Sequence, residues 1–162
     1  MKQRILFVCL GNICRSPAAD GIMHRLVEEA GLSDCYEIDS AGTYAGHRGE
    51  LPDPRMRWAA EPRGYHLTHR SRPVREEDFE EFDLILAMDD NNYEALHRLA
   101  PSREAADRIE RMVTFTREEF PDRFYVPDPY YEGREGFELV LDLLECGCRN
   151  LLAYLEDKRA NG

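Results

Sequence analysis

The sequence has no run of about 18 apolar residues, and its N-terminus leads straight into a strand-like segment, so we expect neither a membrane-spanning helix nor a signal peptide. Cysteines are few: there are five, an odd number, and their spacing forms no disulfide framework. Such usage is typical of a reducing compartment. We therefore expect a cytoplasmic protein that has no structural disulfide and does not insert into a membrane.

Positive charge is scarce as well. The chain carries 21 lysines and arginines against 32 acidic residues, a formal net charge of −11 at pH 7, and lysine occurs only at Lys2 and Lys158. An acidic surface repels nucleic acids and anionic membranes, so neither is expected as a partner. No residues have metal-ligand spacing, and the sequence predicts no metal and no other cofactor. The arginines cluster locally, at positions 47–48 and 69–75. A small anion bound there would be attracted by these arginines more than it is repelled by distant carboxylates, which salt screens.

With 162 residues, 43% of them hydrophobic, the chain has the size of one domain. We assign residues 1–158 to that domain and residues 159–162 to a C-terminal tail. Strands are expected at 4–9, 35–39 and 83–88, helices at 19–30, 53–61, 91–100 and 137–155, and an ambiguous apolar run at 112–115. This alternation predicts an α/β fold, a parallel sheet with helices on both faces. Trp58 is expected in the core, and Asp89 and Asp90 are expected to cap a helix.

The stretch "VCLGNICRSP" (8–17) begins where the first strand ends. It therefore lies at the carboxyl edge of the expected sheet, where ligands bind in such folds. Gly11 and Asn12 tolerate left-handed backbone angles, which lets the loop curl until successive N–H groups point at one centre. Pro17 fits the first turn of the following helix, whose dipole adds positive potential at the same place. The loop is predicted to bind a tetrahedral oxyanion.

Three side chains of this loop carry chemistry. The planar fork of Arg15 can bond two phosphate oxygens at once. Cys9 lies at the base of the positive loop, and helix N-termini and cations favour the nucleophilic thiolate form of a cysteine. Ser16 could donate a hydrogen bond to that sulfur and stabilise it as a leaving group. Together these residues predict phosphoryl transfer through a cysteine.

Such a transfer also needs a proton for the departing oxygen and then a base for water, and one carboxylic acid can serve both steps. The candidate is Asp128 in "VPDPYYEG", between two prolines that stiffen its loop. Tyr130 and Tyr131 follow, and their rings could wall a deep slot that favours an aryl phosphate. The alternative interpretation of Asp128 is a turn-forming residue in an exposed loop.

These segments resemble the low-molecular-weight protein tyrosine phosphatase family, in the family's order and over most of the chain. The matching segments are "FVCLGNICRSPAAD" (7–20), "DSAGT" (39–43), "DPR" (53–55), "FDLILAMD" (82–89) and "DPYY" (128–131). The resemblance implies a single domain with a four-stranded parallel sheet flanked by helices. It also implies an enzyme that hydrolyses phosphotyrosine and small aryl phosphates through a phosphocysteine, without a metal.

By that resemblance, Cys9 is the nucleophile, Arg15 binds phosphate and supports the transition state, and Asp128 is the general acid that later becomes the base. Ser40 and His69 are expected to hold the strained loop asparagine by hydrogen bonds. The substrate is expected to contact the loop and the two tyrosines, that is, Leu10, Gly11, Asn12, Ile13, Cys14, Ser16, Tyr130 and Tyr131.

Two positions bear on specificity. Many relatives carry a bulky aromatic in the loop after "DSAGT", where this chain has Gly46 between Tyr44 and His47, so peptide selectivity stays open. Phosphoarginine-specific relatives tend to carry threonine at the place of Ile13, and the larger isoleucine fits the phosphotyrosine type. A phosphoarginine phosphatase is therefore the first alternative.

Two other functions of the loop would require different residues elsewhere in the chain. A thiol-dependent arsenate reductase of the same fold needs further cysteines after the 83–88 strand, and residues 89–100 contain none. A non-catalytic phosphate-binding module would be expected to lack the nucleophile, the arginine or the acid, and all three are present. Cys14 either forms a protective disulfide with Cys9 after oxidation, as the family does, or simply fills the loop.

The partners that the resemblance implies are phosphoproteins. A phosphotyrosine protein is the expected substrate, and an autophosphorylating tyrosine kinase is one candidate for it. We expect the chain to be a monomer or a weak dimer.

Overall fold

The computed structural model describes residues 2–162. Its sheet has four strands, all parallel, in the order β2-β1-β3-β4. The strands are β1 (Gln3–Cys9), β2 (Tyr36–Gly42), β3 (Leu84–Ala87) and β4 (Ile109–Arg111). Cys9 pairs with Gly42 at the ends of the neighbouring strands β1 and β2, so both strands end at the same edge of the sheet.

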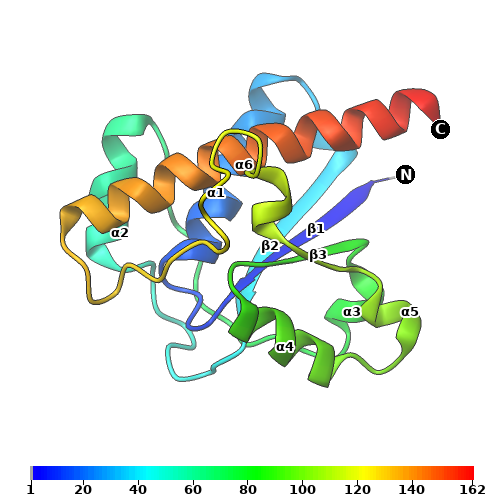
Figure 1. Cartoon of the computed structure of the whole chain (residues 1–162), viewed down its shortest axis with the longest axis horizontal. Coiled ribbons are helices and arrows are strands. Elements are labelled where there is room, and N and C mark those ends of the chain that lie inside the picture. Colours follow the sequence, from blue (N-terminus) through cyan, green and yellow to red (C-terminus); the bar gives the residue numbers. More distant parts are fainter. Residues whose placement is uncertain (1) are drawn as a thin grey trace.

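Helices cover both faces of this sheet (Figure 1). One face carries α1 (Arg15–Glu29), α2 (Pro54–Ala60) and the long α6 (Arg134–Asn161). The other face carries α3 (Asp78–Glu81), α4 (Asp90–Leu99) and α5 (Arg103–Ala106). Three short 3₁₀ turns, Ser33–Cys35, Glu61–Arg63 and Met112–Phe115, complete the elements. Within residues 2–162, none of the helices combines the length and the apolar character needed to cross a membrane.

The alternation of side chains along β1 produces the two layers of the core. Ile5 and Phe7 are fully buried in the cluster formed with α1 and α6, whereas Leu6 and Val8 are fully buried in the cluster formed with α3 and α4. A parallel strand that is covered on both faces has an unbroken apolar sequence, as here. The first strand is therefore fixed from both sides, and its last residue is held in place.

The predicted α/β fold, with a four-stranded parallel sheet and helices on both faces, is confirmed. Some boundaries differ: β2 extends to Gly42, and the apolar run 112–115 is a 3₁₀ turn that follows β4. The strand β4 itself has only three residues, too few to produce a periodic pattern. The predicted boundary between domain and tail, before residue 159, falls inside α6.

The prediction that Trp58 lies in the core is wrong. The buried residues of α2 are Met56 and Ala60, which are four positions apart and share one face of the helix. Trp58 lies midway between them, about 200° around the helix from each, and is 73% exposed.

Gly42 lets the loop after β1 pass close to the end of β2. A Cβ atom at this position would lie 2.6 Å from the carbonyl oxygen of Leu10 and 3.1 Å from the backbone nitrogen of Asn12. Because those neighbours are backbone atoms, a larger residue at position 42 would displace the loop.

Candidate active site

The chain from Cys9 to Ser16 forms a tight loop between β1 and α1 whose carbonyl groups are held from outside. The acceptors are Cys9, Leu10, Gly11 and Ile13, and the donors are the N–H groups of Thr43, Tyr44 and Asp53 and the Ser71 hydroxyl, at 2.8–3.0 Å. In a trans peptide the N–H points away from the carbonyl group of the preceding residue. The N–H groups of residues 10, 11, 12 and 14 are therefore directed into the loop, beside the unpaired N–H groups that open α1.

Asn12 supplies the bend in this loop. Its φ of 57° is the only positive value at a non-glycine residue within positions 2–162. Such a conformation costs roughly 1–2 kcal/mol in an ordinary L residue and less in asparagine. The buried side chain offsets this cost with four hydrogen bonds: it donates to the hydroxyls of Ser16 (2.7 Å) and Ser40 (3.1 Å) and accepts from His69 Nε2 (3.0 Å) and the Arg72 N–H (3.1 Å).

Ser40 and His69, the two residues expected to support Asn12, thus both lie in contact with it. Asn12 donates to the Ser40 hydroxyl and accepts from His69. The Ser40 hydroxyl in turn donates to the carboxylate of Asp20 at 3.0 Å. The asparagine is therefore held by a chain of buried polar groups, and such fully bonded networks are rigid.

Cys9 lies at the base of the loop, with its sulfur 2.9 Å from the hydroxyl oxygen of Ser16. That oxygen already accepts a hydrogen bond from Asn12, so its own proton is free to be donated. The other acceptor in reach is the Ala41 carbonyl oxygen, at the longer distance of 3.4 Å. A thiolate at Cys9 would therefore receive the Ser16 proton.

Arg15 is almost completely buried at the first position of α1. Its Nη1 donates to Asp89 Oδ2 at 2.6 Å and to the Val126 carbonyl oxygen at 3.0 Å. Burial by itself lowers the pKa of Arg15, but the charges of Cys9 and Asp89 outweigh it and raise the pKa above its ordinary value. The guanidinium thus stays charged and fixed in direction, as a site for an oxyanion requires.

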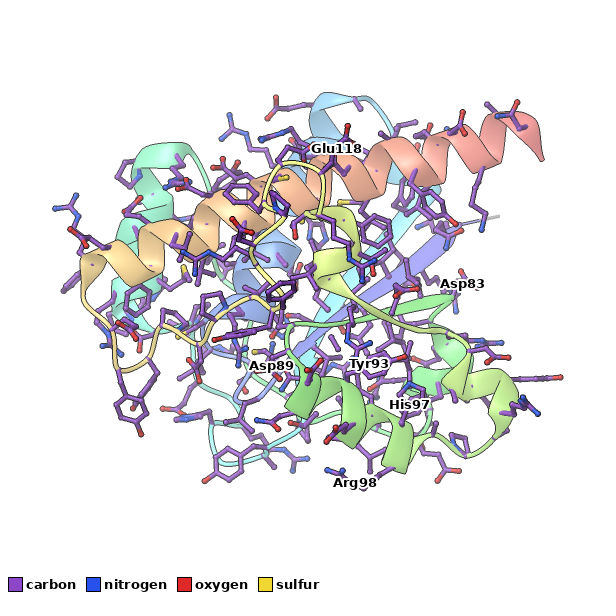
Figure 2. The ribbon with its side chains drawn as sticks, in the orientation of Figure 1. Asp83, Asp89, Tyr93, His97, Arg98 and Glu118 are labelled. Atoms are coloured by element: carbon purple, nitrogen blue, oxygen red, sulfur yellow. The ribbon has the colours of Figure 1, made fainter. Side chains whose placement is uncertain are left out.

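Asp89 is the N-cap residue of α4, on the other side of the sheet, and faces the loop (Figure 2). Its Oδ1 accepts from the N–H of Asn92 and caps the helix, as predicted, while its Oδ2 binds Arg15. The sequence favours the capping role over an electrostatic role near the site, and the structure gives Asp89 both.

Asp128 approaches the same guanidinium from the C-terminal half of the chain. Its Oδ2 lies 3.8 Å from Arg15 Nη2, and its side chain is 43% exposed. Its Oδ1 accepts from the N–H of Tyr130 at 3.1 Å, which orients the carboxylate. Asp128 is therefore in reach of both the buried loop and water.

Arg55 holds the Asp128 loop in place, a role that the sequence analysis does not predict. Its Nη1 donates to the Tyr130 carbonyl oxygen at 2.9 Å, and its guanidinium lies over the rings of Tyr130 and Phe137 at 5.2 and 4.9 Å. Arg55 is fixed in turn by Asp53, and this pairing lowers the pKa of the Asp53 carboxyl. Asp53 caps α2 and donates its N–H to Ile13, so one short segment connects the loop with Asp128.

The loop and the Asp128 segment enclose a cavity of about 220 Å³. It is lined by Cys9, Leu10, Gly11, Ile13, Cys14, Arg15, Tyr44, His47, Asp128, Tyr130 and Tyr131. Asn12 and Ser16, which were expected to contact the substrate, do not line the cavity. They lie behind the loop, where Ser16 bonds the Cys9 sulfur and Asn12 bonds Ser16. Sequence reasoning placed most of this set, and it named Tyr44 and His47 only as neighbours of Gly46.

Gly46 leaves room for one of these rings. A Cβ atom at position 46 would collide with the ring of Tyr44, and that ring meets His47 edge-on at 6.0 Å between centroids. An aromatic wall is therefore present here, supplied by Tyr44 rather than by a side chain at position 46. Tyr130 and Tyr131 form a second edge-on pair, at 5.0 Å.

Cys14 is buried in the loop and differs from Cys9 in its surroundings. Burial, together with the negative charges of Asp53 and Cys9, raises the pKa of the Cys14 thiol well above its ordinary range. Cys14 is therefore a neutral thiol at physiological pH. The described cysteines are all free.

Known proteins match this chain along its length. The family model for low molecular weight phosphotyrosine protein phosphatase matches residues 4–161. The chain belongs to this family. A Synechocystis protein, provisionally named a low molecular weight protein-tyrosine-phosphatase, is 48% identical to this chain over 159 residues. The match spans 98% of this chain and 100% of the Synechocystis protein.

Solved structures also match nearly the whole chain. A protein tyrosine phosphatase from Entamoeba histolytica, crystallised with Hepes in the active site, superposes with a TM-score of 0.91 and 44% identity over 98% of this chain and 99% of that one. An arginine phosphatase from Drosophila superposes with a TM-score of 0.85 and 31% identity, covering 96% and 98%. Family membership makes the phosphatase a cysteine-dependent hydrolase of phosphoproteins.

Proposed function

We propose that the phosphatase hydrolyses phosphotyrosine through a phosphocysteine formed on Cys9. The observation that carries this proposal is the convergence of three groups on one cavity: the Cys9 sulfur, the Arg15 guanidinium and the Asp128 carboxylate. A buried nucleophile, a fixed cation and a half-exposed acid are what phosphoryl transfer to and from sulfur needs.

In the first step the Cys9 thiolate attacks phosphorus. The S–P bond forms while the bond from phosphorus to the tyrosine oxygen breaks, and Asp128 gives its proton to that departing oxygen. Charge spreads over the three equatorial phosphate oxygens, where the inward N–H groups and the Arg15 fork stabilise it.

In the second step Asp128, now a carboxylate, takes a proton from water, and the water oxygen attacks phosphorus. The S–P bond breaks, inorganic phosphate leaves and the thiolate is restored. The hydrogen bond from Ser16 stabilises the departing sulfur, because a hydrogen bond to a thiolate is stronger than one to the uncharged sulfur of phosphocysteine. Atoms and charge balance over the two steps, with water as the only co-reactant.

The decisive experiment replaces the nucleophile while keeping the loop. Cys9→Ser should reduce hydrolysis of p-nitrophenyl phosphate below detection, while inorganic phosphate still binds in a calorimetric titration. In the wild type, rapid acid quenching during turnover of a ³²P-labelled phosphotyrosine peptide should leave the label on Cys9. Substantial turnover by the variant, or label on another residue, would overturn the proposal.

A phosphoarginine substrate is the second candidate, because the Drosophila arginine phosphatase is structurally similar. Ile13 lines the cavity, so its size acts directly on the substrate. Peptides with phosphotyrosine, phosphoserine or phosphoarginine, and arsenate, should be compared side by side. We expect phosphotyrosine to be preferred and Ile13→Thr to raise activity on phosphoarginine; a wild-type preference for phosphoarginine, or reduction of arsenate, would reassign the substrate.

The physiological substrate, the oligomeric state and the location of the phosphatase are further predictions. A tyrosine kinase as substrate, a monomeric or weakly dimeric state and a cytoplasmic location all stay predictions from the sequence. A Cys9→Ser protein that binds but does not turn over its substrate is the natural probe for the first of them.

A further inference from the structure

A second cavity, of about 490 Å³, lies between α1, β2 and the segment before Arg70. Of the described residues, none lines both this cavity and the reaction cavity. Three of the five histidines in the chain line it, namely His24, His66 and His69, together with Asp20 and Asp39. The sequence indicates no metal, yet imidazole and carboxylate are both ligand types of divalent transition metals.

Three ligand atoms converge at one end of this cavity. His69 Nδ1 lies 3.6 Å from Asp20 Oδ2 and 3.5 Å from Asp39 Oδ1, and all three atoms lie within 4.8 Å of one another. A tetrahedral zinc ion with bonds of about 2.0–2.1 Å holds its ligand atoms roughly 3.4 Å apart. The separations from the imidazole nitrogen to the two carboxylates match that edge length.

The same separations are too long for hydrogen bonds from a protonated imidazole. Charged N–H···O bonds measure about 2.7–2.9 Å, and the neighbouring His24 Nδ1 reaches Asp20 Oδ1 at 2.7 Å. His69 has its Nε2 engaged with the Asn12 carbonyl oxygen, an acceptor, so Nε2 carries the proton. In neutral His69 the lone pair of Nδ1 therefore faces two carboxylate oxygens, an arrangement that a cation between them would stabilise.

Each of the three groups is oriented by a further partner, as metal ligands usually are. The Ser40 hydroxyl donates to Asp20 Oδ2 at 3.0 Å, and the Ser40 N–H donates to Asp39 Oδ1 at 2.8 Å. The remaining carboxylate oxygens are occupied elsewhere, by His24 on Asp20 and by Arg72 on Asp39. Both oxygens of each carboxylate are thus held in direction, and the two that face the shared point, Asp20 Oδ2 and Asp39 Oδ1, each accept one hydrogen bond from Ser40.

We propose that Asp20, Asp39 and His69 bind a divalent transition metal ion, of which Zn²⁺ has the geometry that fits. The fourth position faces the open cavity and is left to water. The ion holds His69 in the form that donates Nε2–H to Asn12, and so fixes the asparagine that bends the catalytic loop. This site goes beyond the proposed phosphatase reaction, and either could fail without the other.

Zinc binding should be measured in the Cys9→Ser protein, because a reactive thiolate binds zinc on its own account. Calorimetric titration with ZnCl₂ should give one site per chain. In the same background, Asp39→Asn and His69→Gln should each weaken binding at least about tenfold, the loss found even for outer-shell partners of metal ligands. His97→Gln is the matched control: His97 is an exposed histidine on α4, beyond the other face of the sheet, and its loss should leave zinc affinity unchanged (Figure 2).

Two readouts keep the proposal testable if those variants fold poorly. With Co²⁺ in place of zinc, the Cys9→Ser protein should show the visible bands of a tetrahedral nitrogen and oxygen site, with no thiolate charge-transfer band. In ¹⁵N spectra of the same protein, zinc should shift His69 Nδ1 while Nε2 keeps its proton. Binding that survives both ligand substitutions, a Co²⁺ spectrum with thiolate character, or a His69 Nδ1 signal that zinc leaves unchanged would each overturn the site.

Discussion

The floor of the reaction cavity and its rim are built in opposite ways. The floor, by which we mean Cys9, Asn12, Arg15 and Ser16, is buried and has a fixed hydrogen-bond partner for each side chain. The rim, by which we mean Tyr44, His47, Tyr130 and Tyr131, has three exposed tyrosines and a half-buried histidine, and its rings form two edge-on pairs. The difference shows where fixed side-chain positions are needed. Stabilising the charge on the phosphate oxygens depends on groups that are held in place before the reaction, whereas the aromatic ring of the substrate can be recognised by adaptable surfaces.

The largest effect we expect comes from oxidation of the floor. Peroxide should convert the Cys9 thiolate to a sulfenic acid, which the thiolate form of Cys14 then attacks to form a disulfide and release hydroxide. Activity should fall almost to zero and return fully with dithiothreitol. In Cys14→Ser the loss should become progressively irreversible, measured as recovered activity and as sulfinic acid on Cys9 by mass spectrometry.

The pH dependence of this protection follows from the raised pKa of Cys14. Only the thiolate attacks, and below a thiol's pKa its fraction rises about tenfold per pH unit. The share of activity that dithiothreitol recovers after peroxide treatment should therefore increase with pH across the neutral range. Equal recovery in wild type and Cys14→Ser at every pH would show that Cys14 only fills the loop.

The next effect concerns the acid that bridges floor and rim. Asp128→Asn keeps the acceptor for the Tyr130 N–H but cannot deliver a proton, so hydrolysis of aryl phosphates should slow by roughly 10² to 10⁴-fold. The loss should grow as the leaving group becomes more basic, which a series of substituted phenyl phosphates would measure. A loss that shrinks with poorer leaving groups would contradict the role of Asp128 as acid.

How much of this the sequence predicts depends on how far apart the partners are in the chain. The loop from Cys9 to Arg15 was predicted because its signal is local: a buried strand, residues that allow left-handed angles and the start of a helix lie together within a few positions. The strands β1 and β3 and the helix α6 were expected for the same reason, since their apolar patterns are continuous.

What the sequence missed are contacts between distant segments. The bond from Asp89 to Arg15 joins positions 74 apart, and Arg55 reaches the Tyr130 carbonyl oxygen across 75 positions. The sequence correctly predicts Asp89 as a helix cap, but its second oxygen is free for another role that only the fold defines. The grouping of Asp20 with His69 is equally invisible to any search for short metal-binding spacings.

A smaller effect should follow from loosening the floor without removing a reacting group. Asn12→Ala loses the four side-chain hydrogen bonds and places alanine at a positive φ. A shift of roughly 2 kcal/mol against the curled loop corresponds to a loss of about 30-fold in kcat/KM.

Asn12→Gly separates the two causes, because glycine accepts the backbone angle but lacks the amide. If the hydrogen bonds dominate, both variants lose activity and bind inorganic phosphate more weakly. If Asn12→Gly is as active as the wild type, the backbone angle is the whole contribution. Alanine activity within twofold of wild type would mean that the floor tolerates disorder, and the contrast with the rim would disappear.

The smallest effect belongs to the rim. Tyr131 is 93% exposed and meets Tyr130 edge-on, so its removal leaves the floor untouched. An aromatic contact with the substrate ring contributes about 0.5–1 kcal/mol beyond buried area. Tyr131→Ala should therefore raise KM for a phosphotyrosine peptide by about 2- to 5-fold with kcat unchanged, Tyr131→Phe should resemble wild type, and an alkyl phosphate should be hydrolysed equally by all three. A fall in kcat, or an equal penalty on the alkyl substrate, would mean that Tyr131 positions Asp128 and that the rim takes part in the chemistry assigned to the floor.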